Sequence, residues 1–377
     1  MTPAELSRTV LRSVRGAVEE QELSVPVPAR IVVQPPPRPG CGDYASNVAL
    51  QLARDAGRPA REVAEILRKR LIGSAGIAGV EIAGPGFLNF TLGDGAQAAL
   101  VREVLSQGDG YGDRSARSAR GGPAGEAGAG RGEAPGPVPT SGREPLPAHR
   151  PDAALPSTPT ARGVVVAEAL VRLRAAAEGP AEGAGEAVTH PVPFPVPPEL
   201  SALVARLGAD EARWALLRPA AQDPVRAPER PVQRESNPRF RVQYAYARAR
   251  ALGRYAQELG FRSEPGDIGA PVGARGAGLS AGGASAAQTL QAFHTLLATY
   301  PSVIETAARL RAPDRVVRHL EATADAFFRW HDDYPPLPVG EQKPLAVHRA
   351  RLALAEAGRT VLANGLRLLG ISAPEHL

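Results

Sequence analysis

The residues best suited to chemistry lie in one basic and aromatic string. Residues 239–255 hold five arginines and four aromatic residues without one acid. On a helix, Arg241, Tyr244 and Arg248 would share one face, because residues three and four apart are neighbours. Guanidinium groups beside aromatic rings can neutralise phosphates and stack on unpaired bases, so the string indicates nucleic-acid binding. The alternative is a solvated basic face with Tyr244 and Tyr246 packed into the interior.

Patterns typical of catalysis or metal binding are absent from the sequence. It has no phosphate-binding loop that follows a strand and opens a helix. Its seven histidines are scattered, and the single cysteine, Cys41, has no partner at metal-ligand spacing. We therefore expect no catalytic residue, no metal and no cofactor.

The charge balance is basic, with a net charge of +5 and a pI near 9.7. Nearly all of it comes from arginine, since Lys69 and Lys343 are the only lysines. A polyanionic partner and the codon bias of a GC-rich genome explain this equally well. One cysteine cannot form an internal disulfide, and no apolar run approaches the ~20 residues of a membrane span. We expect a cytoplasmic protein with no membrane partner and no signal peptide.

Hydrophobic patterning divides the chain into three regions. Residues 1–112 are predicted as a small α+β domain, in which the strands cover residues 31–33, 80–82 and 87–92. Residues 113–197 are rich in Gly, Ala and Pro and predict a long disordered linker, because they bury too little surface to offset the entropy of ordering.

A short island in that linker, residues 164–173, could form a helix or a strand. Residues 198–377 are predicted as an all-α helical bundle. Its longest helices are expected over residues 238–259 and 345–369, and two separate helices are expected over 286–299 and 302–310.

Two strings in the first region resemble a known family. GDYASNVAL at residues 42–50 and GPGFLNF at residues 84–90 are similar to motifs of the N-terminal additional domain of arginyl-tRNA synthetases. In that family the domain grips the tRNA elbow and reads a D-loop base. The resemblance implies tRNA contacts by Tyr44, Phe87 and Asn89. Packing inside the domain is the alternative for Tyr44 and Phe87.

The third region resembles the DALR anticodon-binding domain of the same family. Asn237-Pro238 followed by VQYAYAR at residues 242–248 is similar to the family's NP…VQYAHAR helix, with Tyr246 in place of the usual His. That replacement leaves the base preference of the helix open. Bundle surface is the alternative for one of the implied contacts, Arg367. The tRNA contacts implied here are Arg241, Gln243, Tyr244, Arg248 and Arg367.

Between these regions the family has a Rossmann-type catalytic domain with HIGH-like and KMSKS-like motifs that bind ATP. Here the same place is taken by the low-complexity stretch, which contains no lysine to stabilise the phosphates of adenylate formation. The resemblance therefore implies a non-catalytic tRNA-binding paralogue that does not ligate arginine itself. The expected partner is tRNA, of the arginine-accepting class, and an aminoacyl-tRNA synthetase is a second candidate. The alternatives are a protein-interaction module and a tRNA-binding subunit that serves a separate synthetase in trans.

Overall fold

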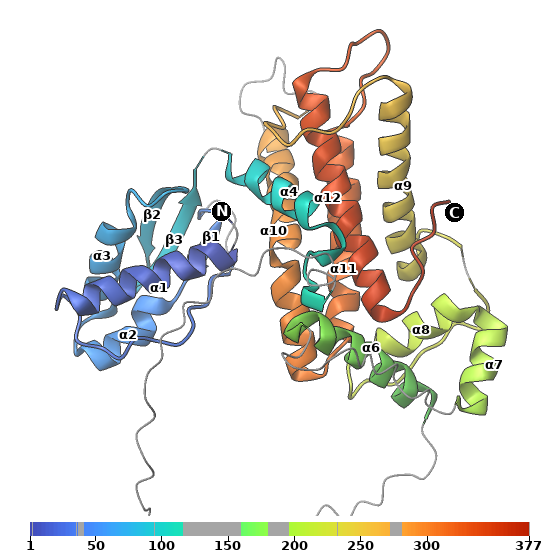
Figure 1. The fold of residues 1–377 in the computed structure, drawn as a ribbon, viewed down its shortest axis with the longest axis horizontal. Coiled ribbons are helices and arrows are strands. Elements are labelled where there is room, and N and C mark those ends of the chain that lie inside the picture. Colours follow the sequence, from blue (N-terminus) through green and yellow to red (C-terminus); the bar gives the residue numbers. More distant parts are fainter. Residues whose placement is uncertain are drawn as a thin grey trace, which may run out of the picture.

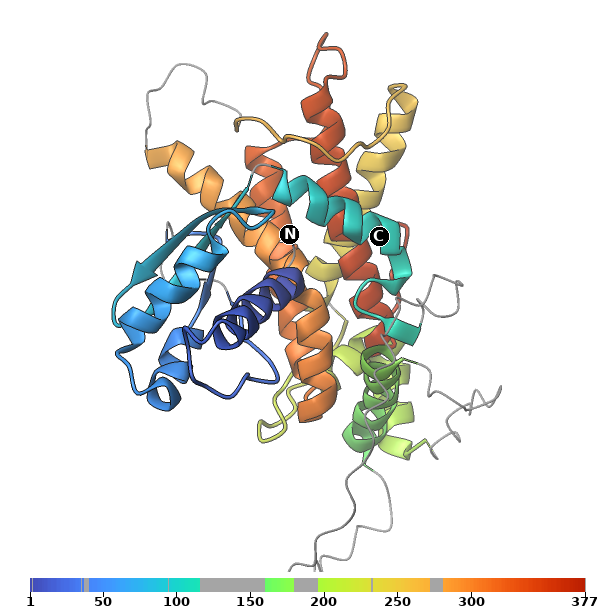
Figure 2. The same cartoon turned by 60° about the vertical axis from the view of Figure 1, so that its left-hand side comes forward.

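The computed structural model describes residues 1, 3–34, 36, 41–93, 95–115, 160–179, 196–231, 233–271 and 281–376. Within these ranges, a small module of helices and strands lies beside a larger group of helices (Figure 1). A view turned by 60° again places the small module on the side where helix α10 runs (Figure 2). None of the described helices is long and apolar enough to cross a bilayer.

The small module is built on a three-stranded antiparallel sheet in the order β1-β3-β2. Helices α2 and α3 pack against one face of the sheet, and α1 packs on α3. Leu88 and Phe90 of β3 are buried toward these helices, whereas Phe87 and Asn89 alternate to the opposite face. The elements of the module are α1 (Pro3–Glu19), β1 (Tyr44–Ser46), α2 (Val48–Ala56), α3 (Ala60–Leu71), β2 (Ile77–Ala83) and β3 (Phe87–Leu92).

The prediction of a strand over residues 31–33 is wrong. Residues 31–33 belong to no strand, and the neighbouring Gln34 makes only a single bridge to the sheet, at Ala45. Side-chain hydroxyls bind the carbonyls of the β-branched run instead: Ser7 donates to Ile31 (2.6 Å) and Ser46 donates to Val32 (2.8 Å). The apolar run therefore reflects burial of Ile31 rather than a ladder of strand hydrogen bonds.

The larger part of the structure is helical and shares one hydrophobic core. This core includes Leu100, Val101 and Val104 of α4, although residues 1–112 are predicted as one domain. The division of the chain into domains remains a prediction, and the packing favours a boundary before α4. The elements are α4 (Ala96–Gln107), the 3₁₀ turn η1 (Gly108–Gly110), α6 (Ala161–Glu178), α7 (Pro198–Leu207), α8 (Ala209–Leu217), α9 (Pro238–Glu258), α10 (Ala281–Leu310), α11 (Asp314–Asp333) and α12 (Ala346–Leu369).

Helix α6 lies within the predicted linker over residues 113–197, where it settles the island at 164–173 as a helix and extends it at both ends. Its N-cap is Thr160, whose hydroxyl accepts a hydrogen bond from Gly163 N at 3.1 Å. Val165 and Leu173 are fully buried, and the helix packs against α8, α10 and α12. Residues 116–159 and 180–195 of the predicted linker lie outside the described residues.

Helix α10 continues through Pro301, where the sequence predicts a break. Proline has no N–H, so the carbonyl of Leu297 four residues earlier loses its helical donor. The hydroxyl of Tyr111 donates to that carbonyl at 2.9 Å, and its ring stacks on Tyr300 with centroids 6.1 Å apart. Tyr111, which follows η1 at the end of α4 (the α4–η1 corner), thus donates the hydrogen bond that the Leu297 carbonyl loses to proline.

Candidate nucleic-acid interface

Helix α9 carries the basic and aromatic string, and its first turn is firmly capped. The side-chain oxygen of Asn237 accepts hydrogen bonds from Arg239 N (2.9 Å) and Phe240 N (3.4 Å), and Pro238 occupies the first helical position. The helix starts and ends within one residue of the predicted span 238–259. It has a buried inner side and an outer side, which differ in their chemistry.

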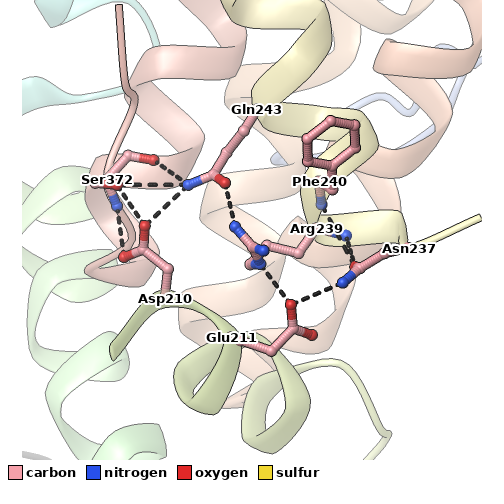
Figure 3. Close-up of polar contacts among 7 residues, drawn as sticks. All are labelled: Asp210, Glu211, Asn237, Arg239, Phe240, Gln243 and Ser372. Carbon is pink, nitrogen blue, oxygen red and sulfur yellow. Dashed lines mark hydrogen bonds and ion pairs between the residues drawn. The ribbon is translucent and has the colours of Figure 1, made fainter. Parts of the chain in front are cut away.

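The inner side begins with an ion pair between α8 and α9, shown in Figure 3. Arg239 Nε lies 2.6 Å from Glu211 Oε2, and both side chains are at most one-tenth exposed. Asn237 Nδ2 donates to the same carboxylate oxygen at 2.7 Å. Because the pair is desolvated and each partner makes a further hydrogen bond, it fixes the start of α9 against α8.

Gln243 belongs to the same inner side, where it joins three segments (Figure 3). Its oxygen accepts from Arg239, and its Nε2 donates to Asp210 Oδ2 and to Ser372 O, each at 2.9 Å. The side chain is 1% exposed. This burial argues against the predicted direct RNA contact by Gln243, whose polar atoms instead hold residue 372 against α8 and α9.

On the outer side, three half-buried aromatic rings form a row across α9 and α11. Phe240 stacks on Tyr244 with centroids 6.0 Å apart, and Tyr244 stacks on Phe328 at 5.4 Å. Arg241 places its guanidinium 5.0 Å from the Phe328 centroid and pairs its Nε with Asp325 at 2.5 Å. We call Phe240, Arg241, Tyr244, Arg248 and Phe328 the outer surface.

Arg248 lies one helical turn beyond Tyr244 and is exposed. Burial, and then the nearby Arg248 charge, lower the pKa of His331 on α11. That imidazole therefore stays neutral near pH 7, and Arg248 supplies positive charge at this end of the row. The structure brings the predicted Arg241, Tyr244 and Arg248 onto one face, as their spacing indicates.

In the small module, the motif residues are divided between packing and surface. Gly42 has φ = +85°, and a Cβ there would lie 2.6 Å from Phe90 O, so glycine allows this close approach. The next residue, Asp43, donates its N–H to Phe90 O (2.7 Å) and accepts from Leu92 N (2.7 Å). This pair clamps the start of β1 onto β3.

Of the three residues predicted to touch tRNA in this module, Phe87 is the most accessible. It is 40% exposed at the tip of the β2–β3 hairpin, and Asn89 on the same face is 8% exposed. Tyr44 is 5% exposed within the module's core, and burial, followed by the charge of Asp43, raises the pKa of its phenol. The structure therefore favours packing as the role of Tyr44.

Arg367 lies near the end of α12 and contacts the α4–η1 corner. Its Nη2 pairs with Asp113 Oδ2 at 2.8 Å and donates to Asp109 O at 3.2 Å. The side chain is half exposed, so its position is set by these protein contacts, in agreement with the bundle-surface alternative.

Sequence reasoning does not find Phe328, which completes the aromatic row. Phe327 and Phe328 are adjacent on α11, and only the first is buried. Two adjacent phenylalanines on one helix cannot both face the core, so one ring is expected at the surface. Nothing in the sequence places that ring beside Tyr244. Among the described residues, no group of three or more His, Cys, Asp or Glu side chains is placed to hold a metal ion.

Comparison with known families matches both modules. The family described as Arginyl tRNA synthetase N terminal domain matches residues 8–92, and the DALR anticodon binding domain matches residues 242–377. The structure of Thermus thermophilus arginyl-tRNA synthetase matches with a TM-score of 0.51 at 15% identity, with 100% of each chain covered. At that identity the match shows a likeness of fold alone.

The sheet module and the bundle therefore each resemble a tRNA-synthetase domain, and the bundle resembles the DALR anticodon-binding class. The chain is related, more particularly, to arginyl-tRNA synthetases. It is 40% identical over 181 residues to an arginine–tRNA ligase of Paenarthrobacter aurescens, which covers 48% of this chain and 30% of that protein. It is 50% identical over 112 residues to one of Frankia alni, which covers 30% of this chain and 20% of that protein. The chain thus spans less than a third of the length of either relative.

Proposed function

We propose that this protein binds tRNA of the arginine-accepting class without aminoacylating it. The outer surface of α9 and α11 would contact the anticodon loop, and the open face of the sheet would contact the elbow and D-loop. The observation that carries the proposal is the row of Phe240, Tyr244 and Phe328 beside Arg241 and Arg248.

The outer surface suits an unpaired RNA loop for two physical reasons. Rings that already stack on one another are held in place, so a base that stacks on the row loses little additional freedom. Such base–aromatic stacking contributes ~1–3 kcal/mol per base by alanine substitution. Exposed Arg248 then lies within reach of the backbone phosphates, where an arginine displaces condensed counterions.

The sheet module offers a smaller second contact. Phe87 presents a ring at the hairpin tip, on which an extruded base can stack. Asn89 lies on the same face but is 8% exposed, so burial argues against a direct contact by its amide, as it does for Gln243. Two contacts on one tRNA would raise the overall affinity above that of either module alone.

The proposal that the chain is not catalytic rests on its sequence. It has no His-x-Gly-His string, and its two lysines, Lys69 and Lys343, lie in α3 and in the segment before α12. The described residues between the two family matches include α4, α6 and α8, whose side chains fill the bundle core. An assay of the purified chain with ATP, arginine and arginine-accepting tRNA should give no charged tRNA. Charging above background would contradict this part of the proposal.

Binding is tested by gel shift across a salt series, with arginine-accepting tRNA and an unrelated tRNA. We expect tighter binding of the first, and a weakening of roughly fivefold to 100-fold on Tyr244→Ala, with most of the affinity restored in Tyr244→Phe. Thermal unfolding of each variant controls for lost packing against Phe240 and Phe328. If the wild-type chain binds neither tRNA near physiological salt, the proposed function is wrong, and a protein-docking role becomes the better account.

A further inference from the structure

Tyr255 is an aromatic residue that neither the core nor the outer surface uses. It lies in the last turns of α9 and is 48% exposed. The large aromatic side chains of the bundle are otherwise mostly buried, among them Trp214, Phe293, Tyr300, Phe327 and Trp330. A half-exposed tyrosine gains less from packing than a buried one, so its place on the helix is informative.

The helical register places Tyr255 in line with Tyr244. Tyr255 follows Tyr244 by eleven residues. At ~100° per residue this is a rotation of three full turns plus ~20°, so both side chains leave the helix on nearly the same side. At ~1.5 Å per residue the rise along the helix axis is ~16 Å. Arg248 and Ala251 lie between them within ~40° of the same line. The exposed Arg248 therefore lies between the half-buried ring of Tyr244 and the exposed ring of Tyr255, and the small side chain of Ala251 leaves room beside Tyr255.

The charge along this line is favourable for a polyanion. From Arg239 to Tyr255 the helix has no acidic residue, and the first acid after the string is Glu258. A strand that reached from one ring to the other would pass over Arg248, whose guanidinium is exposed. A rise of ~16 Å corresponds to about five steps of a stacked single strand at ~3.4 Å per nucleotide.

We infer that Tyr255 is a second base-stacking position, about five stacked nucleotides along the same RNA strand from the base at Tyr244. Arg248 neutralises the phosphates between the two positions. The ligand class is an unpaired segment of RNA, and the contact is tolerant of base identity because every base has a π-face. This inference rests on the proposed function and adds a position outside the string VQYAYAR.

The first test measures binding of arginine-accepting tRNA to the full chain and to variants at this position. Tyr255→Ala should weaken binding by about fivefold to 100-fold. Tyr255→Phe should bind like the wild type, because the ring is retained, whereas Tyr255→Leu should behave like the alanine variant. The matched control is Leu259→Ala, which removes a 52% exposed apolar side chain from the same end of the helix and should leave affinity unchanged.

The second test reports on stacking directly. In Tyr255→Trp the new indole is exposed, whereas Trp214 and Trp330 are buried, so a change of emission on adding tRNA comes mainly from position 255. Stacking of a base should quench that emission, and the wild-type chain should show a much smaller change. An unquenched indole in the bound state overturns the inference.

The outcomes separate this inference from the proposed function. If Tyr244→Ala weakens tRNA binding and Tyr255→Ala does not, the second position is wrong while the function stands, and the exposed ring is better explained as a protein contact. If the wild-type chain binds no tRNA, both fail together. Loss of affinity in Tyr255→Leu as well as Tyr255→Ala, with Tyr255→Phe intact, supports the stacking role.

Discussion

The inner and outer sides of α9 are built from the same few residue types and have opposite surroundings. On the inner side Arg239 is buried in an ion pair with Glu211, and Gln243 gives every polar atom to protein partners. On the outer side Tyr244 stacks in a half-buried row and Arg248 is exposed. An arginine or amide in a binding motif can therefore serve the fold, and its neighbours on the next face can remain available to a ligand.

The comparison also explains why α9 tolerates so many arginines. Arg239, Arg241 and Arg250 each pair with a carboxylate, on Glu211, Asp325 and Glu375 respectively. The paired arginines position α9 within the bundle, and the charge presented to solvent is smaller than the sequence indicates.

The largest expected effect is on the inner side. Glu211→Ala would leave the Arg239 guanidinium buried without its counter-charge, and breaking one partner of a buried pair costs ~3–5 kcal/mol of folding stability. Thermal or urea unfolding followed by tryptophan fluorescence measures this loss. Glu235→Ala is the control, because Glu235 is 71% exposed and lies 3.9 Å from Arg241. Equal stability of the two variants would contradict the contrast between the two sides.

Acid should destabilise the bundle core, where two histidines are almost fully buried. Burial lowers the pKa of His294 and of His319 to about 4, below the ordinary value of 6.5. Unfolded histidine therefore binds protons more readily, so stability is complete above pH 6.5 and falls as the pH drops toward 4. At pH 5 the loss is about 2 kcal/mol for each histidine.

Urea unfolding at pH 7 and pH 5, followed by tryptophan fluorescence, measures this dependence in the bundle. Trp214 and Trp330 both lie in its core, while residues 1–112 contain no tryptophan and no histidine. His319→Gln should reduce the loss of stability at pH 5 by about 2 kcal/mol, because one of the bundle's histidines with a lowered pKa is removed. An unchanged dependence in that variant would show that His319 is not a source of the acid sensitivity.

Tyr246→His restores the residue usual in the resembled motif and tests whether position 246 belongs to the inner side. The Tyr246 side chain is buried in the bundle core, so the smaller polar ring should cost ~1–3 kcal/mol of stability. The ratio of affinities for arginine-accepting and unrelated tRNA should stay the same, because the side chain does not reach the outer surface. A changed ratio with unchanged stability would move this position to the binding face.

The smallest expected effect on folding comes from Arg248→Ala, on the outer side. Loss of an exposed side chain should alter stability by less than ~0.5 kcal/mol. The slope of log affinity for tRNA against log salt should fall by about 1, because one phosphate contact is lost. Arg206→Ala on α7, which removes another exposed arginine, should leave that slope unchanged. Equal slopes for both variants would place Arg248 outside the interface.

Local signals in the sequence predict much of the fold. The pair Asn237-Pro238 gives the start of α9, Gly370 in the left-handed conformation ends α12, and Gly84-Pro85-Gly86 separates β2 from β3. Each depends on backbone chemistry within a few residues. Helix α6 is harder to predict, because its apolar residues are spread around the helix and Gly- and Pro-rich segments flank it.

The candidate site, too, is predictable only where its geometry depends on residues close together in the sequence. Helical spacing alone places Arg241, Tyr244 and Arg248 on one face. The burial of Gln243 depends on Asp210 and Ser372, which are 33 and 129 residues away, and no local pattern indicates those contacts.

The docking of α4 on α12 has a consequence for synthesis. Asn364 Nδ2 donates to Gly108 O (2.9 Å) and to Tyr111 O (3.1 Å), residues that precede it by 256 and 253 positions. At ~5–20 residues per second on the ribosome, the α4–η1 corner waits ~10–50 s for its partner helix. Until then Leu100, Val101 and Val104 have no core to enter, so the nascent chain should depend on chaperones that cover this segment.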